Sequence, residues 1–280
     1  MAARAAVEAL LRERKFDRTL TSSMPERQES EVASFNVEAV DRGLTGGLPR
    51  GQVSEIVGPV SSGRTSLALA ALGAATRRGE YAALVDTFDR FDPPTGAAAG
   101  IVLERMLWVR GQAISKTAGA IDPSWLPGVR TVGGPGTLVE RTIDRALKSL
   151  NLVVQSGVCT LVVIDFIDVP AVAMRRMPAS TWFRIAHAIE DSETAVVILS
   201  SAPVARSARG RSIQLQAGSR AVTTDVQWAG THDRSRRFKG LRSEASIGAA
   251  HWAGASRLTI EAASVNVIPG AGSQPARAIR

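Results

Sequence analysis

A glycine-flanked loop at residues 58–65 holds the residues of this chain best suited to bind phosphate. It follows a short apolar stretch and precedes an alanine-rich one. Gly58, Gly63 and Thr65 fit the spacing G-x-x-x-x-G-K-[ST], with Arg64 in the place of the lysine. Glycines let backbone N–H groups approach phosphate oxygens, and the start of a helix adds a positive dipole. The sequence therefore predicts a strand, a phosphate-binding loop and a helix; the alternative is a turn that binds no ligand.

Arg64 changes what this loop is expected to do. Lysine is a compact charge that contacts the β- and γ-phosphates, whereas arginine carries a wider planar fork. The fork follows a phosphoryl group less well during transfer, so we expect nucleotide binding to tolerate Arg64 better than hydrolysis does. The Thr65 hydroxyl is the expected ligand of an accompanying Mg²⁺ ion. The predicted nucleotide-binding residues are Gly58, Pro59, Ser61, Ser62, Gly63, Arg64, Thr65 and Ser66.

An acid at the end of a second apolar run completes the expected metal site. Residues 159–164 have the composition of a buried parallel strand, and Asp165 follows them directly. Such a strand delivers a carboxylate to the water shell of Mg²⁺ beside a phosphate-binding loop. We therefore predict Thr65 and Asp165 as the metal-site residues, Asp165 acting through water. Asp168 is interpreted as a turn residue.

The pattern of elements predicts an α/β fold. Strands alternate with helices from residue 53 to residue 199, which indicates a largely parallel sheet with helices on both faces. Further strands beyond residue 212 are expected to close the sheet in antiparallel fashion. The predicted parts are an N-terminal amphipathic helix (1–20), a linker (21–34), a core domain (35–265) and a disordered tail (266–280).

Composition bounds the partners and the compartment. A net charge of +8 and a pI near 10.8 favour a polyanionic partner such as nucleic acid. The single cysteine excludes a disulfide framework and a cysteine metal site, and it fits a reducing cytoplasm. The apolar runs are too short to span a bilayer, so we expect no membrane partner.

The residues around the loop resemble the start of the RecA recombinase core. From Gly46 to Thr65 the chain contains the order GGLP-x-G-x-V-x-E-I-x-GP-x-SSG-x-T. The match extends beyond the loop itself, which makes it more specific than the loop motif alone. The resemblance covers roughly residues 35–262 and implies a RecA-like fold with ATP and Mg²⁺ as cofactors.

The resemblance also indicates functional positions that this chain has changed. The glutamate that orients the attacking water falls at Phe88, two residues after Asp86, so no catalytic residue is predicted. Asp89, one residue further on, is the alternative acid. The Asn-Gln pair that senses the γ-phosphate falls at Ser200 and Ser201. Together with the arginine in the loop, these changes predict a degenerate ATP site.

Two loops at which RecA-like proteins hold single-stranded DNA carry arginines in this chain. Cationic loops contact phosphates without reading bases, and the alternative is a pair of solvated basic loops. The most basic window, residues 233–242, is a second candidate for nucleic acid or a hairpin tip that charge keeps soluble. The predicted DNA-binding residues are Arg175, Arg176, Arg206, Arg209, Arg211, Arg236, Arg237 and Lys239.

A RecA-like core with a weakened ATP site and a basic tail is similar to ImuA, the recombinase-related accessory family of the bacterial mutasome. Residues 107–110 share this similarity. The resemblance implies a cytoplasmic, damage-induced (SOS) protein that acts in translesion synthesis with a Y-family polymerase relative and an error-prone replicative-type polymerase. We expect an adaptor that binds nucleotide and single-stranded DNA, and the sequence is compatible with a homo-oligomer. The alternatives are an active DNA-dependent ATPase of the RecA type and an interaction module that binds neither ligand.

Overall fold

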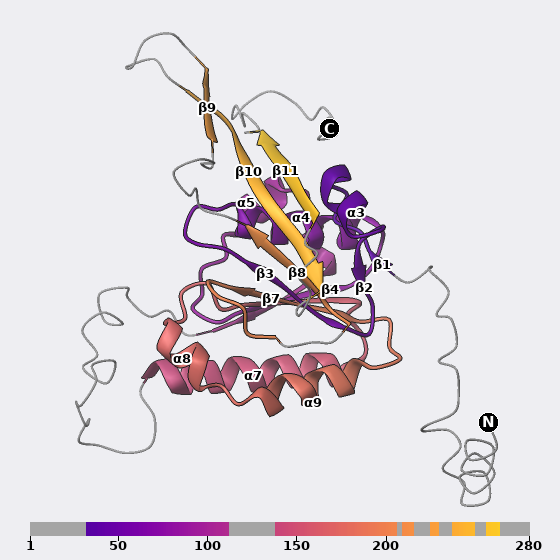
Figure 1. Cartoon of the computed structure of the whole chain (residues 1–280). Helices are drawn as coiled ribbons and strands as arrows, with labels where there is room; N and C mark the ends of the chain where they lie inside the picture. Colours follow the sequence, from indigo (N-terminus) through magenta and orange to yellow (C-terminus); the bar gives the residue numbers. More distant parts are fainter. Residues whose placement is uncertain are drawn as a thin grey trace, which may run out of the picture. The chain divides into compact units, whose positions relative to one another are not determined.

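Figure 1 shows a computed structural model of the chain. The described residues are 32–111, 138–205, 209–215, 225–229, 237–249 and 256–263. The expected N-terminal helix (1–20), the linker up to residue 31 and the expected tail (266–280) lie outside them. Among the helices within these ranges, none is long and apolar enough to cross a membrane.

A nine-stranded sheet organises the described part of the chain. Its order is β11-β10-β8-β3-β7-β6-β4-β5, with β9 paired to β10 outside this path. The strands from β8 to β5 run parallel, whereas β10 is antiparallel to β8, β9 and β11. This arrangement confirms the expected α/β fold. The strands of the sheet are β3 (Val53–Val57), β4 (Ala82–Asp86), β5 (Met106–Arg110), β6 (Leu161–Asp165), β7 (Ala195–Ser200), β8 (Arg211–Leu215), β9 (Asp225–Ala229), β10 (Arg237–Ala249) and β11 (Ser256–Ala263).

Helices cover both faces of the sheet, α7 and α9 on one and α3 and α4 on the other (Figure 1). Successive side chains of a strand point to opposite faces. In β6, Val162 and Ile164 pack with α7 and α9, whereas Leu161 and Val163 pack with α4. The strands are therefore apolar throughout, as expected of a parallel sheet covered on both faces. The helices are α3 (Glu38–Gly43), α4 (Arg64–Arg77), α5 (Pro93–Ala98), the 3₁₀ turn η1 (Leu103–Arg105), α7 (Leu138–Ser156), α8 (Ala171–Arg176) and α9 (Ala179–Ile189).

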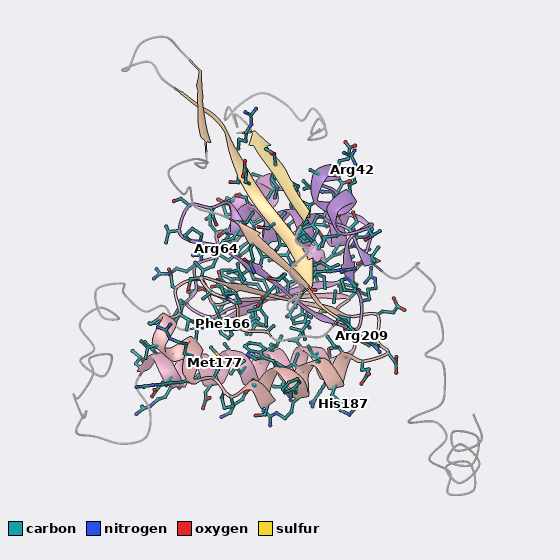
Figure 2. All side chains as sticks on the ribbon, viewed as in Figure 1. Arg42, Arg64, Phe166, Met177, His187 and Arg209 are labelled. Carbon is teal, nitrogen blue, oxygen red and sulfur yellow. The ribbon has the colours of Figure 1, made fainter. Side chains whose placement is uncertain are left out.

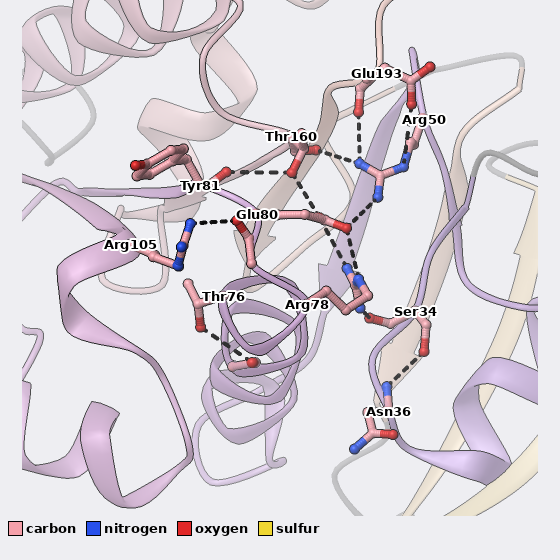
Figure 3. Close-up of polar contacts among 12 residues, drawn as sticks. Ser34, Asn36, Arg50, Thr76, Arg78, Glu80, Tyr81, Arg105, Thr160 and Glu193 are labelled. Carbon is pink, nitrogen blue, oxygen red and sulfur yellow. Dashed lines mark hydrogen bonds and ion pairs between the residues drawn. The ribbon is translucent and has the colours of Figure 1, made fainter.

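An ion network joins the segments that lead into the amino ends of the strands (Figure 3). The Glu80 carboxylate accepts hydrogen bonds from Arg50 Nη2 at 3.0 Å, from Arg78 Nε at 2.8 Å and from Thr160 Oγ1 at 2.8 Å. Arg50 also donates to the carbonyl oxygen of Glu193 at 2.9 Å. Although burial acts to raise it, the hydrogen bonds from Arg78 and Thr160 and the arginine charges lower the pKa of Glu80 below its ordinary value. The network links the segments at the amino ends of these strands, whereas the phosphate-binding loop lies at their carboxyl ends.

Two expected boundaries are corrected by the structure. β1 (Val32–Ala33) pairs with β2 (Leu48–Pro49), and Ala33 is buried, so residues 32–34 belong to the core and not to the linker. Residues 237–242, expected between two strands, lie within β10. This strand has 13 residues because it pairs with β9 along its first half and with β8 along its second half.

Candidate nucleotide site

The carboxyl ends of the parallel strands meet beside the phosphate-binding loop. The register aligns Val57 with Ser200, and it aligns Asp165 with both Leu199 and Asp86. Ligands of open parallel sheets bind outside the carboxyl ends of the strands. A cleft of about 630 Å³ opens at this edge, and the loop and the start of α4 form one of its walls. Its charged lining residues within the described ranges are Arg64, Arg90, Asp86, Asp165 and Asp168.

The loop has the backbone conformation that its glycines predict. Gly63 has a φ of 90°, in the left-handed region that favours glycine. A Cβ added at Gly58 would lie 2.5 Å from Ser62 Oγ and 3.0 Å from Leu215 Cβ. Both glycines are therefore required by the local geometry, one by its dihedral angle and the other by close approach.

Two features of the loop suit it to an anion. α4 begins at Arg64, and the first N–H groups of a helix have no partner within that helix. The Ser62 hydroxyl is buried and has no hydrogen-bond partner within the described part of the chain, and Ser62 lines the cleft. A phosphate oxygen that accepted hydrogen bonds from these groups would satisfy donors that the protein leaves open. The residues present therefore fit a nucleotide phosphate.

The guanidinium of Arg64 is bound to backbone carbonyl groups. Its Nη1 donates to the carbonyl oxygen of Gly58 and, at 3.3 Å, to that of Ser200, and the residue is only 4% exposed. Burial lowers the pKa of the Arg64 guanidinium, and the charges of Asp165 and Asp168 counteract this in part. Arginine nevertheless stays charged in proteins. Arg64, labelled in Figure 2, thus ties the first residue of the loop to the end of β7.

Asp165 ends β6 and lines the cleft, and its role at a metal site stays a prediction. Its Oδ1 accepts a hydrogen bond from the Ile167 N–H at 2.7 Å. Burial raises the pKa of Asp165 to about 6, and the charges of Asp86 and Asp168 act in the same direction. The Ile167 N–H and Arg64 oppose this rise. The carboxylates of Asp86, Asp165 and Asp168 therefore repel one another at the carboxyl ends of the strands, and the buried Arg64 offsets part of this repulsion.

Replacing Asp165 by asparagine should raise the free energy of unfolding at pH 7.5, in EDTA, by about 2 kcal/mol. The folded-state pKa lies above that of an ordinary aspartate, so the ionised carboxylate opposes folding above pH 6. This penalty vanishes as the pH falls towards 4, and the gain of the variant should vanish with it. Urea titrations at both pH values measure the effect, with Asp144→Asn on the exposed face of α7 as control. An Asp165→Asn protein no more stable than wild type at pH 7.5 would contradict the prediction.

The position of the expected glutamate is filled by a core residue. Phe88 is 6% exposed and packs with α7 and α9 while also lining the cleft. The alternative acid, Asp89, has a φ of 56° and accepts hydrogen bonds from Arg110 Nε at 2.9 Å and Nη2 at 2.8 Å. Asp89 is directed to the edge strand β5 and is not among the described residues that line the cleft. Neither residue places an acid in the position that the RecA resemblance assigns to the glutamate.

In the RecA pattern an Asn-Gln pair at the end of β7 senses the γ-phosphate. The two serines found at these positions are not placed for that role. Ser200 Oγ donates to the carbonyl oxygen of Ala202 at 2.8 Å. Ser201 is exposed and lies outside the described lining of the cleft. The carbonyl group of Ser200, and not a side chain of the pair, takes part in the site through its bond with Arg64.

Asp86, Arg90 and Asp168 line the cleft, although the sequence analysis assigned none of them to the site. Asp86 accepts hydrogen bonds from the backbone N–H groups of Arg90 and Phe91, both at 2.8 Å, so it shapes the loop after β4. The Arg90 side chain then donates from Nε to Asp168 at 3.1 Å. Asp86 could have been assigned to the cleft from the sequence, because it follows an apolar run just as Asp165 does.

Glu55 is a further residue whose role was not predicted from the sequence. It lies in β3 and is 2% exposed. Its carboxylate accepts hydrogen bonds from the N–H groups of Val204 at 3.0 Å and Ala205 at 3.1 Å, and from Ser212 Oγ at 2.9 Å. An acid in an otherwise apolar strand was the signal for a buried polar cluster. Glu55 fastens the segment between β7 and β8 to the strand that leads into the phosphate-binding loop.

The arginines predicted to bind DNA do not form one cluster. Arg175 and Arg176 are exposed at the end of α8, and Arg176 forms an ion pair with Glu140 at 3.6 Å. Figure 2 shows Arg209 far along the sheet from Met177, the residue that follows α8. Val204 and Ala205, which follow β7, bond to Glu55 of β3, and β8 pairs with the same strand.

Most of the other residues predicted to bind DNA lie in or next to the strands β8 and β10. The backbone N–H of Arg211, the first residue of β8, donates to Ser54 Oγ at 3.1 Å, and its Nε is buried with no hydrogen-bond partner among the residues that the structure describes. Arg237 and Lys239 occupy positions in the half of β10 that pairs with β9. Arg206 and Arg236 lie outside the described residues.

Comparison with known proteins gives partial matches to one family. The RecA N-terminal domain matches residues 5–117. The chain is 44% identical over 81 residues to the protein RecA of Arthrospira platensis, covering 29% of this chain and 22% of that protein. It is 40% identical over 97 residues to RecA of Rubrobacter xylanophilus, covering 34% and 28%. It is 32% identical over 155 residues to the chloroplastic DNA repair protein recA homolog 1 of Arabidopsis thaliana, covering 48% and 35%.

The chain thus spans about a fifth to a third of the length of these relatives. The matched family domain accounts for the phosphate-binding loop, α4 and the strands β3, β4 and β5. The sheet continues the same α/β plan through β6 and β7. The matches support a RecA-like family over part of the chain, and the described core has a mixed α/β fold with a mostly parallel sheet.

Proposed function

We propose that the chain is a RecA-like DNA-repair accessory protein that binds ATP and turns it over slowly or not at all. Similarity to RecA and to a protein named for DNA repair supports the broad role in repair or recombination. The N–H groups at the start of α4 and the Ser62 hydroxyl would hold the phosphates, and Thr65 and Asp165 would hold Mg²⁺. Among the described residues, no group of three or more His, Cys, Asp or Glu side chains is placed to hold a metal ion. Mg²⁺ is therefore proposed to enter with the nucleotide.

The contacts of Arg64 carry the proposal of slow turnover. The cation next to Thr65 is engaged with two backbone carbonyl groups, while the loop around it keeps the geometry of a phosphate cradle. Phosphoryl transfer depends on charges that follow the transferring group. Arg64 does not supply such a charge in this arrangement, and Phe88 does not supply the acid that would orient water. We therefore expect a site that binds nucleotide but lacks the groups that speed its hydrolysis.

Phosphate release from ATP by the purified protein tests this expectation. Wild type and Thr65→Ala should release phosphate at the same background rate, with or without single-stranded DNA. Release that DNA stimulates and that Thr65→Ala lacks would overturn the proposal in favour of an active DNA-dependent ATPase. Binding of a fluorescent nucleotide to wild type, and weaker binding to Thr65→Ala, is the positive part of the expected result.

We further propose that Arg175 and Arg176 contact the phosphates of single-stranded DNA. Replacing both by glutamine should weaken binding about tenfold at 50 mM salt and reduce the salt slope by about 1–2. The loss should be alike for different base sequences, because phosphate contacts carry no sequence information. Fluorescence anisotropy with labelled oligonucleotides measures both quantities.

The matched control for this prediction is the double variant Arg42→Gln with Arg77→Gln. It removes the same charge from α3 and from the end of α4, on the opposite face of the sheet from α7 and α9. An equal loss of affinity in both double variants would show that net charge alone drives binding and would contradict a site at α8.

The resemblance to ImuA extends the proposal to partners. We propose that the chain assembles a Y-family polymerase relative and an error-prone replicative-type polymerase in translesion synthesis, with self-association as a further property. Size-exclusion chromatography with light scattering, of the chain alone and mixed with the purified polymerase relative, tests both statements. Elution of the two proteins as separate monomers at micromolar concentration would contradict them.

A further inference from the structure

We infer that Arg64 makes this site bind ADP as tightly as ATP, so that the proposed nucleotide cleft does not distinguish diphosphate from triphosphate. The inference rests on the proposed nucleotide binding and adds the kind of nucleotide that occupies the site. It follows from which groups can reach a third phosphate and which are already engaged.

The groups that would hold the first two phosphates are independent of the Arg64 side chain. They are the backbone N–H groups at the start of α4, which have no partner within that helix, and the hydroxyl of Ser62, which is buried, lines the cleft and has no partner within the described ranges. These donors stay in place whether or not a third phosphate is present. ADP therefore meets the same cradle as ATP.

The cations that line the cleft are engaged elsewhere. Arg64 donates to the carbonyl oxygens of Gly58 and Ser200, and Arg90 donates to Asp168 at 3.1 Å. To reach a γ-phosphate with Nη1, Arg64 would have to leave both carbonyl groups, and the hydrogen bonds lost would offset those gained. Lysine, with a flexible stem and a compact charge, can turn towards a third phosphate more freely than the planar guanidinium of arginine.

The remaining charged groups of the cleft also disfavour a third phosphate. Three aspartates and two arginines line the described cleft, so an additional negative charge enters a lining that is negative on balance. The end of β7 offers no compensating donor, because Ser200 Oγ is bound to Ala202 and Ser201 lies outside the lining. A Mg²⁺ ion would lessen the repulsion for both nucleotides.

Calorimetric titration of wild type with ADP and with the β,γ-imido analogue of ATP, both with Mg²⁺, tests the inference. The two dissociation constants should agree within about threefold. In Arg64→Lys the ATP analogue should bind about tenfold more tightly than ADP, because the lysine ammonium can reach the third phosphate. The control Arg42→Lys makes the same chemical change on the exposed surface of α3 and should match wild type.

The possible outcomes separate the inference from the function on which it rests. Failure of wild type to bind either nucleotide at millimolar concentration would overturn the nucleotide site itself. A wild-type preference of about tenfold or more for the ATP analogue would overturn the inference and leave the site standing. Equal binding by both wild type and Arg64→Lys would show that Arg64 is not the determinant. The wild-type measurement needs no variant, so a poorly folded Arg64→Lys protein would not prevent the test.

Discussion

Replacing Glu55 by alanine should lower the free energy of unfolding by about 3–5 kcal/mol. The Glu55 carboxylate is buried and accepts hydrogen bonds from two backbone N–H groups and one hydroxyl. Truncation leaves two buried donors and one half-buried donor without this partner, and each buried group costs about 1–3 kcal/mol. Glu55→Gln should lose less, because one amide oxygen can still accept from the N–H groups of Val204 and Ala205. Urea titration followed by circular dichroism measures both variants.

Amide hydrogen exchange adds a local measurement to this prediction. Val204 and Ala205 lie outside regular secondary structure, yet their N–H groups should exchange slowly in wild type because Glu55 accepts from them. In Glu55→Ala both should exchange fast. Glu104→Ala, at an exposed position in η1, is the control and should leave stability and exchange unchanged. Retention of full stability by Glu55→Ala would refute the role assigned to this carboxylate.

Replacing Glu80 by alanine should cost about 2–4 kcal/mol at pH 7, because it removes the common acceptor of Arg50, Arg78 and Thr160. The side chains of Arg50 and Glu80 are 10% and 20% exposed, so water replaces the lost contacts poorly. The exposed pair of Glu38 and Arg42 offers a contrast, and Glu38→Ala should cost at most about 0.5 kcal/mol.

The pH dependence of stability distinguishes this network from simple packing. The pKa of Glu80 in the folded protein lies below its ordinary value of 4.5. Its ionised form therefore stabilises the fold above pH 4.5, and this contribution is lost as the pH falls through the folded-state pKa. Wild type should lose stability between about pH 5 and pH 3 more steeply than Glu80→Ala does. Parallel curves for the two proteins would show that the carboxylate contributes no charge-dependent stability.

Much of the fold was predictable because its signals are local. The strands β4, β6 and β7 are short, continuous apolar runs between glycine or polar segments, which is the pattern of strands buried on both faces of a parallel sheet. The loop was predictable from its glycines, since Gly58 and Gly63 meet steric demands that other residues do not. These features depend on residues close in the sequence.

The parts that sequence reasoning missed depend on contacts between distant residues. Besides Gly58 in its own loop, the Arg64 side chain donates to the carbonyl group of Ser200, 136 residues later in the chain. Glu55 meets its partners about 150 residues away. The separation of Arg209 from α8 depends on the pairing of β8 with β3, two strands that lie about 155 residues apart in the sequence. Periodicity and spacing carry no information about such pairings, because they describe one element at a time.

The position of β3 in the sheet limits how the chain can be divided into fragments. Both neighbours of β3, namely β7 and β8, come from residues after 194, and Ser243 of β10 donates to the carbonyl oxygen of Ser62 in the loop. A fragment that ended near residue 117, where the match to the RecA N-terminal domain ends, would leave the loop-bearing strand with two unpaired edges. Expression designed on that boundary should yield an aggregating product, and the smallest autonomous unit must extend through β10.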